Sequence, residues 1–185
     1  MNKRSDAELV ELCNSGTRDE AIAAFESLYR RHRDYVVRVS LRFGSDREIA
    51  ADVLQETFLY LLNKFPPGGD GLALTGQLRS LLYPVSKNLT LNALRRQRRI
   101  APAEVEPDQL PDPGTVDPHY EDFARLVSGL SIRHREVVLL RFVDGMTLRE
   151  IAEVLDIPTG TVKSRLSIAT RALRSISENE LANKK

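Results

Sequence analysis

The stretch REVVLLRFVDGMTLREIAEVLDIPTGTVKSRL, residues 135 to 166, decides the fold of the second half of the chain. It opens on an apolar run that ends in a glycine. Thr147 and Glu150 then stand three residues apart, which is the spacing of a capping box at the start of a helix. A tight turn at residues 156 to 158 follows, and Thr159 opens a last helix. Two helices joined by such a turn predict a helix-turn-helix unit.

The outer face of that last helix carries no acidic residue. Val162 and Leu166 lie on the side predicted to face inward, whereas the opposite arc offers only cations and hydroxyls. The residues of this arc are Lys163, Ser164, Ser167, Thr170, Arg171 and Arg174. An ordinary solvated helix usually gains stability from opposite charges on such a face. The pattern therefore favours contact with the major groove of DNA.

Length and composition narrow the class of protein. The 185 residues suffice for one ordinary domain or two small ones. One cysteine and three dispersed histidines give no disulfide and no metal-ligand spacing, so we expect no metal, cofactor or catalytic residue. The chain contains neither a run of about 18 apolar residues nor a signal sequence. We therefore expect a cytoplasmic protein that does not insert into a membrane.

An acidic, proline-rich segment separates two helical parts. Residues 101–120 hold five acidic residues, no lysine or arginine, and five of the nine prolines. Proline interrupts hydrogen-bonded structure and like charges repel, so this composition predicts a flexible linker. We expect an all-α protein of two small helical domains. They are residues 1–100 and residues 119–178, with the linker at 101–118 and a tail at 179–185.

Capping-box spacings mark two helix starts in the first domain. Ser5 precedes Glu8 by three residues, and Ser45 precedes Glu48 in the same way. Between these starts, one side of a long helix is apolar, and residues 30–33 are predicted to face outward. The residues predicted to face inward are Ile22, Phe25, Tyr29, Val36 and Phe43.

The segment from Asp46 to Phe65 predicts a helix with two different faces. The inward face carries Leu54, Phe58, Leu61, Leu62 and Phe65. The opposite face carries Asp52, Gln55, Glu56, Leu59 and Asn63. A leucine among acidic and amide groups favours a protein-docking surface, and a solvated face with one exposed leucine is the simpler alternative.

Residues 77–99 predict a third long helix, which ends in LRRQRR. Its inward residues are Leu78, Leu81, Leu82, Val85 and Leu89. Its terminal cations are Arg95, Arg96, Arg98 and Arg99. Such a cluster fits phosphate neutralisation, and it fits equally a helix end whose arginines complement the dipole.

Two features interrupt the pattern around this helix. Pro84 lacks a backbone donor, so either the helix kinks near Ser80 or a new helix begins there. The preceding segment PPGGDGLALTG, residues 66–76, is rich in glycine but lacks the Gly-Lys-Ser/Thr ending of a phosphate-binding loop. We expect it to connect two helices.

Three segments together resemble bacterial sigma factors of the extracytoplasmic-function (ECF) group of the sigma-70 family. They are DVLQETF at 52–58, LLYPVSKNLTLNALRRQRR at 81–99 and the helix-turn-helix stretch at 135–166. A helix-turn-helix alone occurs in many regulators, but its pairing with the two upstream segments is specific. The resemblance covers nearly the whole chain except the linker. It implies a sigma factor that binds RNA polymerase core, reads the minus-thirty-five and minus-ten elements and assists strand opening, with no enzyme activity or small-molecule substrate of its own.

The resemblance implies roles for three sets of residues. Docking on the clamp helices of the polymerase beta-prime subunit is expected of Asp52, Gln55, Glu56, Leu59 and Asn63. Contact with the minus-ten element is expected of Lys87, Asn88, Arg95, Arg96, Arg98 and Arg99. Contact with the minus-thirty-five element is expected of Thr161, Lys163, Ser164, Arg165, Ser167 and Arg171. The resemblance further implies contact with the polymerase beta flap and an anti-sigma factor that grips both domains.

This chain departs from the family pattern in the third helix. Many members carry tryptophan where Leu81 stands and arginine where Pro84 stands, and this chain has no tryptophan. Stacking of an unpaired base on that aromatic side chain is therefore missing. We expect the loop from Gly68 to Thr75, together with Asn88, to form a substitute pocket for an extruded base.

The residues alone leave two other interpretations open. One is a stand-alone helix-turn-helix regulator whose first domain dimerises or senses a signal, and which would read palindromic half-sites instead of two different elements. In the other, the first domain only sequesters a protein partner. Neutralising the four terminal arginines of the third helix would then leave activity unchanged.

Overall fold

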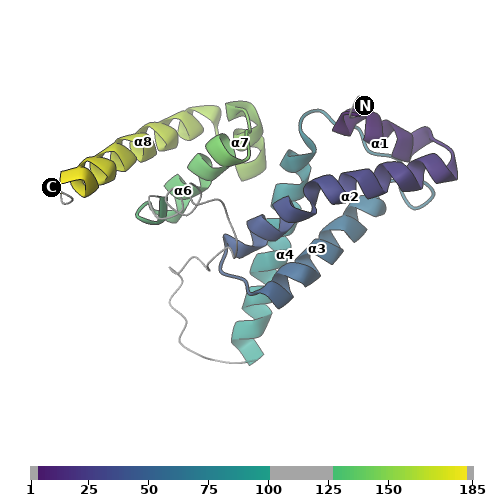
Figure 1. The fold of residues 1–185 in the computed structure, drawn as a ribbon, viewed down its shortest axis with the longest axis horizontal. Coiled ribbons are helices and arrows are strands. Elements are labelled where there is room, and N and C mark those ends of the chain that lie inside the picture. Colours follow the sequence, from purple (N-terminus) through teal and green to yellow (C-terminus); the bar gives the residue numbers. More distant parts are fainter. Residues whose placement is uncertain (1–3, 101–126, 183–185) are drawn as a thin grey trace. The chain divides into compact units, whose positions relative to one another are not determined.

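Helices are the regular elements of this computed structural model, which describes residues 4–100 and 127–182 (Figure 1). The chain divides into two compact units, Met1–Asp112 and Pro113–Lys185. The prediction of an all-α protein built from two small helical domains is confirmed. The linker expected at 101–118 lies outside the described residues, so its flexibility and the domain boundaries stay predictions. No helix in the described part of the chain is both long enough and apolar enough to cross a membrane.

Unit 1 is a bundle organised around its second helix. Its elements are α1 (Asp6–Ser15), α2 (Arg18–Leu41), α3 (Arg47–Leu62) and α4 (Leu78–Ile100). Helix α2 contacts α1, α3 and α4, and α3 also packs on α4. Figure 1 shows α2 flanked by α1 on one side and by α3 on the other. The large side chains at its centre are Leu28, Tyr35, Val36, Val39, Leu61, Leu78, Leu82 and Tyr83.

Capping boxes begin the first two helices of this unit. At α1 the Glu8 amide donates to Ser5 Oγ over 3.2 Å, and the Ser5 amide donates to the Glu8 carboxylate over 2.6 Å. That predicted start is confirmed. A second box, in which Thr17 and Glu20 satisfy each other's amides, begins α2 directly after Gly16. The sequence contains its spacing, but we predicted no helix boundary there.

The helix predicted to begin at Asp46 is present, but the capping box predicted at Ser45 and Glu48 is wrong. Helix α3 is capped one residue later by Asp46, whose carboxylate accepts from the Ile49 amide at 2.8 Å. The Ser45 hydroxyl is buried and lies 2.8 Å from Ser40 Oγ, so it is not available for the helix end. Because aspartate is as good a cap as serine, local spacing alone could not choose between the two residues.

Three residues of the predicted apolar stripes and one residue predicted to face outward differ in the structure. Ile22 of α2 is 58% exposed and Leu62 of α3 is 46% exposed. His32, expected among the outward residues 30–33, is buried because α1 covers that side of α2. Phe43 is half-buried in the turn after α2, beyond the end of the helix. The buried face of α2 is therefore rotated toward α1.

A cluster of polar and charged side chains connects α1 to α2. His32 Nε2 lies 2.8 Å from the Asp6 carboxylate, and Arg31 donates both to this carboxylate and, over 2.8 Å, to the Arg4 carbonyl. The hydrogen bond from His32 is the largest cause that holds the pKa of Asp6 below its ordinary value of 3.8. Arg31 acts in the same direction, whereas partial burial opposes it. Asp6 is thus stabilised as a carboxylate in the folded protein.

The segment between α3 and α4 contains no regular element, as expected of a helix connection. The Asn14 side chain at the end of α1 binds this segment. The Asn14 side-chain amide donates to the Leu72 carbonyl, and Asn14 Oδ1 accepts from the Leu72 backbone amide, both at 2.9 Å. Gly71, at φ +94°, packs against the same asparagine, where a Cβ would lie 3.1 Å from Asn14 Oδ1.

Helix α4 runs without a break through Pro84, so the alternative of a new helix beginning near Ser80 is wrong. Its buried face contains Leu78 and Leu82 as predicted, but also Tyr83, Ser86 and Thr90. The other predicted inward residues, Leu81, Val85 and Leu89, are half-buried. Two small hydroxyl residues, Ser86 and Thr90, are therefore buried on a face that an apolar pattern could not reveal.

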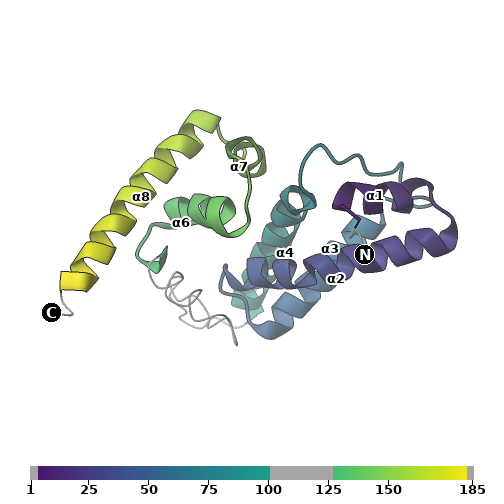
Figure 2. The ribbon, with the colours of Figure 1, turned by 45° about the horizontal axis from the view of Figure 1, so that its top comes forward.

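Unit 2 contains the helix-turn-helix. Its described elements are α6 (Ile132–Val138), the π-helical turn η1 (Leu139–Val143), α7 (Leu148–Leu155) and α8 (Thr159–Ala182). Helix α8 packs on α6 and α7, and Figure 2 shows α7 at its N-terminal end. The core includes Val127, Leu130, Val138, Leu139 and Ala169. The capping box of Thr147 and Glu150 begins α7 as predicted.

The contribution of Asp6 to the pH dependence of the free energy of unfolding can be tested. Its pKa is lowered on folding, so its contribution to the free energy of unfolding is complete above about pH 4 and is lost as the pH falls through the folded-state pKa. We expect Asp6→Asn to lower stability at neutral pH and to flatten this acid-side loss. Urea denaturation between about pH 2 and pH 7 measures both effects. Asp19→Asn, at an exposed carboxylate of α2, is the matched control; an equal flattening in this control would contradict the assignment.

Candidate functional site

The outer face of α3 and the residue that caps its C-terminus carry all the residues predicted to dock on polymerase. They are Asp52, Gln55, Glu56, Leu59 and Asn63, and every one of them is exposed. The opposite face of the helix is buried in the bundle through Val53, Thr57, Phe58 and Leu61. Leu59 is 49% exposed, which is high for a large aliphatic side chain. The structure therefore brings the predicted residues onto one solvent-accessible strip.

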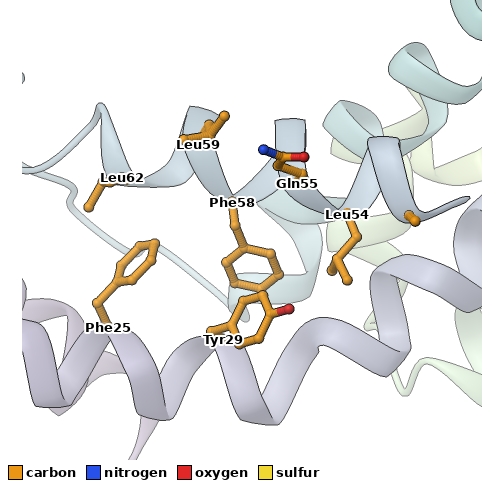
Figure 3. A pocket seen from close by; sticks show the side chains of 8 residues that line it. Phe25, Tyr29, Leu54, Gln55, Phe58, Leu59 and Leu62 are labelled. Carbon is orange, nitrogen blue, oxygen red and sulfur yellow. The ribbon is translucent and has the colours of Figure 1, made fainter. Parts of the chain in front are cut away.

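An apolar groove runs beside this strip, between α2 and α3. In Figure 3, Phe58 points from α3 toward Tyr29 of α2, and Leu59 and Gln55 lie on the side of α3 away from α2. The Phe58 and Tyr29 ring centroids are 4.8 Å apart in an edge-to-face arrangement. The groove has a volume of about 410 Å³ and is bordered by Leu62.

A second hollow of about 700 Å³ continues this groove toward α1 and the start of the α3–α4 loop. Phe25, Tyr29 and Leu62 line both parts. The two side chains that we wrongly predicted to be buried, Ile22 and Leu62, both line this second part. The sequence signal was present as apolar residues on both helices. A periodic pattern, however, does not distinguish a closed core from an open groove.

The C-terminal end of α4 is basic and solvent-exposed. Arg95, Arg96, Arg98 and Arg99 are exposed, and none of them forms an ion pair with a described residue. Arg95 donates to Asn92 over 3.2 Å. About two turns before Arg95, Asn88 is exposed and Lys87 is half-buried. The Lys87 ammonium lies 5.6 Å from the centre of the Phe43 ring. The six predicted residues thus lie on one helix.

The turn between α7 and α8 sets the position of the last helix. Asp156 ends α7 in the left-handed region at φ +52°, and the Ile157 amide donates to the Ala152 carbonyl over 3.0 Å. Ile151 and Val162 are completely buried where the two helices meet. These contacts leave the outer arc of α8 facing solvent. The predicted helix-turn-helix is confirmed.

Most of the residues predicted to contact DNA on α8 are exposed. The exposed ones are Lys163, Ser164, Ser167 and Arg171, together with Thr170 and Arg174 of the same arc. Thr161 and Arg165 are partly buried at the edge of this arc. Ile168 is 48% exposed beside Ser167, which we did not predict. The arc therefore combines cations, hydroxyls and one apolar side chain.

The described residues include no group of three or more histidine, cysteine, aspartate or glutamate side chains that could hold a metal. Cys13 is buried, and burial raises the pKa of its thiol to about 11. The thiol is therefore protonated at neutral pH and packs as a small apolar group. His134 Nδ1 lies 2.9 Å from Ser131 Oγ, and His119 lies outside the described residues.

Comparison with known proteins assigns both units to one family. Residues 28–100 match Sigma-70 region 2, and residues 126–175 match Sigma-70, region 4. The ECF RNA polymerase sigma factor SigL of Mycobacterium tuberculosis is 32% identical over 166 residues, which cover 86% of this chain and 92% of SigL. SigW of Bacillus subtilis, also an ECF RNA polymerase sigma factor, is 25% identical over 167 residues, with 82% and 87% covered.

Two solved structures share the fold. CnrH in complex with the cytosolic domain of CnrY has a TM-score of 0.62 at 22% identity, and covers 94% of this chain and 97% of CnrH. The sigma factor RpoE of Bartonella quintana, in complex with the anti-sigma factor NepR, has a TM-score of 0.63 at 20% identity, with 83% and 96% covered.

These findings define a two-unit, helix-turn-helix transcription factor of the sigma-70 type. The chain belongs to the ECF group of sigma-70 family RNA polymerase sigma factors. It directs transcription from promoters by RNA polymerase, as the resemblance implied. Family membership excludes the stand-alone regulator, because both the region 2 and region 4 signatures are present in one chain.

Proposed function

We propose that this sigma factor uses three surfaces, each on a defined helix. The outer face of α3 docks on the clamp helices of the polymerase beta-prime subunit, the C-terminal half of α4 engages the minus-ten element, and the outer arc of α8 reads the minus-thirty-five element. The observation that carries the proposal is the segregation of charge. The α3 strip holds Asp52 and Glu56 with an exposed Leu59, whereas the end of α4 and the arc of α8 are basic and free of acidic residues.

The polymerase-docking part of the proposal is supported by the groove beside α3. Exposed apolar area next to charged groups is typical of protein interfaces, because apolar burial contributes affinity and the charges fix orientation. Leu59 and Leu62 together present such area. We propose that the partner covers the strip and the adjoining groove together.

The DNA-binding part rests on two kinds of contact. The exposed arginines of α4, which form no ion pair with a described residue, suit phosphate neutralisation, which releases condensed counterions. Lys163 and Ser167 of α8 offer groups that reach phosphates and base edges, and Ile168 can contact a thymine methyl group. On α4, Asn88 is available for the extruded base, and its pocket with residues 68–75 stays a prediction.

Further partners follow from family membership and from the exposed apolar residues. Phe142 of η1 is 64% exposed and Ile132 of α6 is 61% exposed, so unit 2 offers apolar area for the polymerase beta flap. The groove of unit 1 offers similar area for an anti-sigma factor, the kind of partner seen with RpoE of Bartonella quintana. We infer that the protein acts in the cytoplasm by binding, and that catalysis belongs to the polymerase.

Run-off transcription tests the whole proposal. Purified protein and sigma-free bacterial core polymerase are incubated with a random promoter library, and the transcripts are sequenced. We expect enrichment of templates that share two upstream elements separated by a spacer of fixed length. Enrichment of one palindromic element, or assembly with core and no transcript, would contradict the proposal.

Glu56→Arg tests the docking surface. Reversal of a charge within the strip should weaken binding to core polymerase by at least about tenfold, because a like charge then faces the partner. The helicity and the melting temperature should stay close to the parent values, since Glu56 is exposed. Fluorescence titration with labelled core measures affinity. Glu11→Arg is the control, because it makes the same charge change on α1.

Arg171→Ala tests the minus-thirty-five surface. The loss of one phosphate contact should weaken promoter binding by about 1 kcal/mol and lower the slope of log affinity against log salt by about one. Binding of the holoenzyme to a promoter recovered from the library is measured at several salt concentrations. Arg133→Ala removes an exposed cation of α6 and should leave both quantities unchanged. Equal slopes of log affinity against log salt for Arg171→Ala and the parent would show that Arg171 does not contact DNA.

A further inference from the structure

Five buried hydroxyl side chains meet where α2, α3 and α4 pack together. They are Ser40 of α2, Ser45 of the following turn, Thr57 of α3, and Ser86 and Thr90 of α4. Each is at most 1% exposed. Helix bundles usually fill such positions with apolar side chains, and a buried polar group is costly unless it is hydrogen-bonded. We call this set the hydroxyl ladder.

The ladder has two parts, which meet at Ser86. Ser45 Oγ lies 2.8 Å from Ser40 Oγ, which lies 3.0 Å from Thr90 Oγ1. Thr57 Oγ1 lies 3.4 Å from Ser86 Oγ. Within α4, Ser86 Oγ donates to the Leu82 carbonyl and Thr90 Oγ1 donates to the Ser86 carbonyl, each over 2.7 Å. One part joins α2 and its following turn to α4, the other joins α3 to α4, and the bond from Thr90 to the Ser86 carbonyl links the two.

The number of protons limits which of these hydrogen bonds form together. A hydroxyl has one proton, and a carbonyl can only accept. Thr90 Oγ1 lies within donor distance of both the Ser86 carbonyl and Ser40 Oγ, so its single proton serves one of them at a time. Ser86 gives its proton to the Leu82 carbonyl, and its oxygen lies 3.4 Å from Thr57 Oγ1. Each hydroxyl lies beside another buried polar group, so the loss of one hydroxyl takes a hydrogen-bond partner from a buried group.

Helix α4 has a particular need for such support. Pro84 lacks the amide that would bond to the Ser80 carbonyl, and proline within a helix tends to bend it. Directly after it, the side chains of Ser86 and Thr90 bond back to carbonyls four residues earlier, which also tends to bend helices. The course of α4 is therefore not determined by its backbone hydrogen bonds alone.

The same turn contacts α4 at several other points. Phe43 packs near Tyr83, with ring centroids 6.5 Å apart, and the Lys87 ammonium lies 5.6 Å from the Phe43 ring centre. Further along α4, Gln97 reaches Asp46 at 3.5 Å. The turn after α2 thus lies along α4 from Tyr83 to Gln97, with the ladder in the middle of this contact.

We propose that the hydroxyl ladder is a positioning device that fixes the rotation and register of α4, and thereby the presentation of its DNA-contacting side chains. Asn88 lies two residues from both Ser86 and Thr90, which places it on the opposite side of the helix at 100° per residue. A rotation of α4 at the ladder would move Asn88 away from the strand that it contacts. This inference rests on the proposed role of α4 at the minus-ten element.

Thr90→Val and Thr90→Ser test the proposal in the full chain bound to core polymerase. Valine keeps the shape of threonine and removes the hydroxyl, whereas serine keeps the hydroxyl. On a promoter recovered from the library, we expect Thr90→Val to lower the equilibrium fraction of opened promoter by about tenfold, the effect of one unsatisfied buried hydroxyl. Thr90→Ser should restore opening. Permanganate reactivity of unpaired thymines measures the opened fraction.

Two controls separate register from stability. Leu9→Ala truncates a buried side chain of α1, far from the ladder in sequence, and should lower the melting temperature without lowering promoter opening at a temperature where the protein is folded. A template with a mismatched, already opened minus-ten region should largely rescue Thr90→Val. If Leu9→Ala and Thr90→Val reduce opening alike, or if Thr90→Val has no effect on opening, the positioning role is wrong.

Amide hydrogen exchange on the protein without DNA distinguishes failure of this inference from failure of the proposed function. Thr90→Val should speed exchange along residues 85–99 while α1 stays protected, and unchanged exchange along α4 would overturn the ladder as its support. Arg95→Ala tests the proposed role of α4 in promoter opening. If Arg95→Ala leaves opening unchanged while Thr90→Val speeds exchange, the ladder supports α4, but the proposed role of α4 at the minus-ten element is wrong.

Discussion

The burial of α2 on three sides is the constraint on which the first unit depends. Leu28, Val36 and Val39 have no exposed surface, and α1, α3 and α4 all pack on this helix. Each complete burial of such a side chain contributes about 1.5–3 kcal/mol. Since α3 and α4 each turn one face toward α2 and toward one another, their remaining faces are fixed. The acidic strip of α3 and the basic end of α4 are these remaining faces.

The sequence predicted these outer faces well because each depends on helical periodicity alone. The strip with Leu59 on α3 and the arc with Lys163 on α8 both repeat at three- and four-residue intervals, so any helix at these positions exposes them together. The turn at Asp156 and the capping box at Thr147 are equally local signals. The assignment to polymerase subunits needed the family resemblance, because no pattern of charges specifies a partner's name.

The features that the sequence could not predict are pairings between distant residues. His32 is buried because Asp6, 26 residues earlier, supplies a hydrogen bond. Thr90 is buried because Ser40, 50 residues earlier, lies beside it. Polar residues within a helical pattern are ordinarily assigned to solvent, and only the packing of two helices reveals that they form hydrogen bonds with each other. The open groove at Leu62 is the reverse case, because an apolar residue there has no described helix to cover it.

Three ion pairs of the described residues lie away from the arginines at the end of α4 and from the arc of α8. Arg30 pairs with Glu26 and Arg31 with Asp6 on α2, and Arg149 pairs with Glu153 on α7. The arginines at the end of α4 and on the arc of α8 have no such carboxylate among the described residues. A cation already paired would have to exchange its carboxylate for a phosphate, which reduces the gain from counterion release. Keeping acidic residues away from these faces therefore favours DNA binding, while the pairs elsewhere stabilise the helices that carry them.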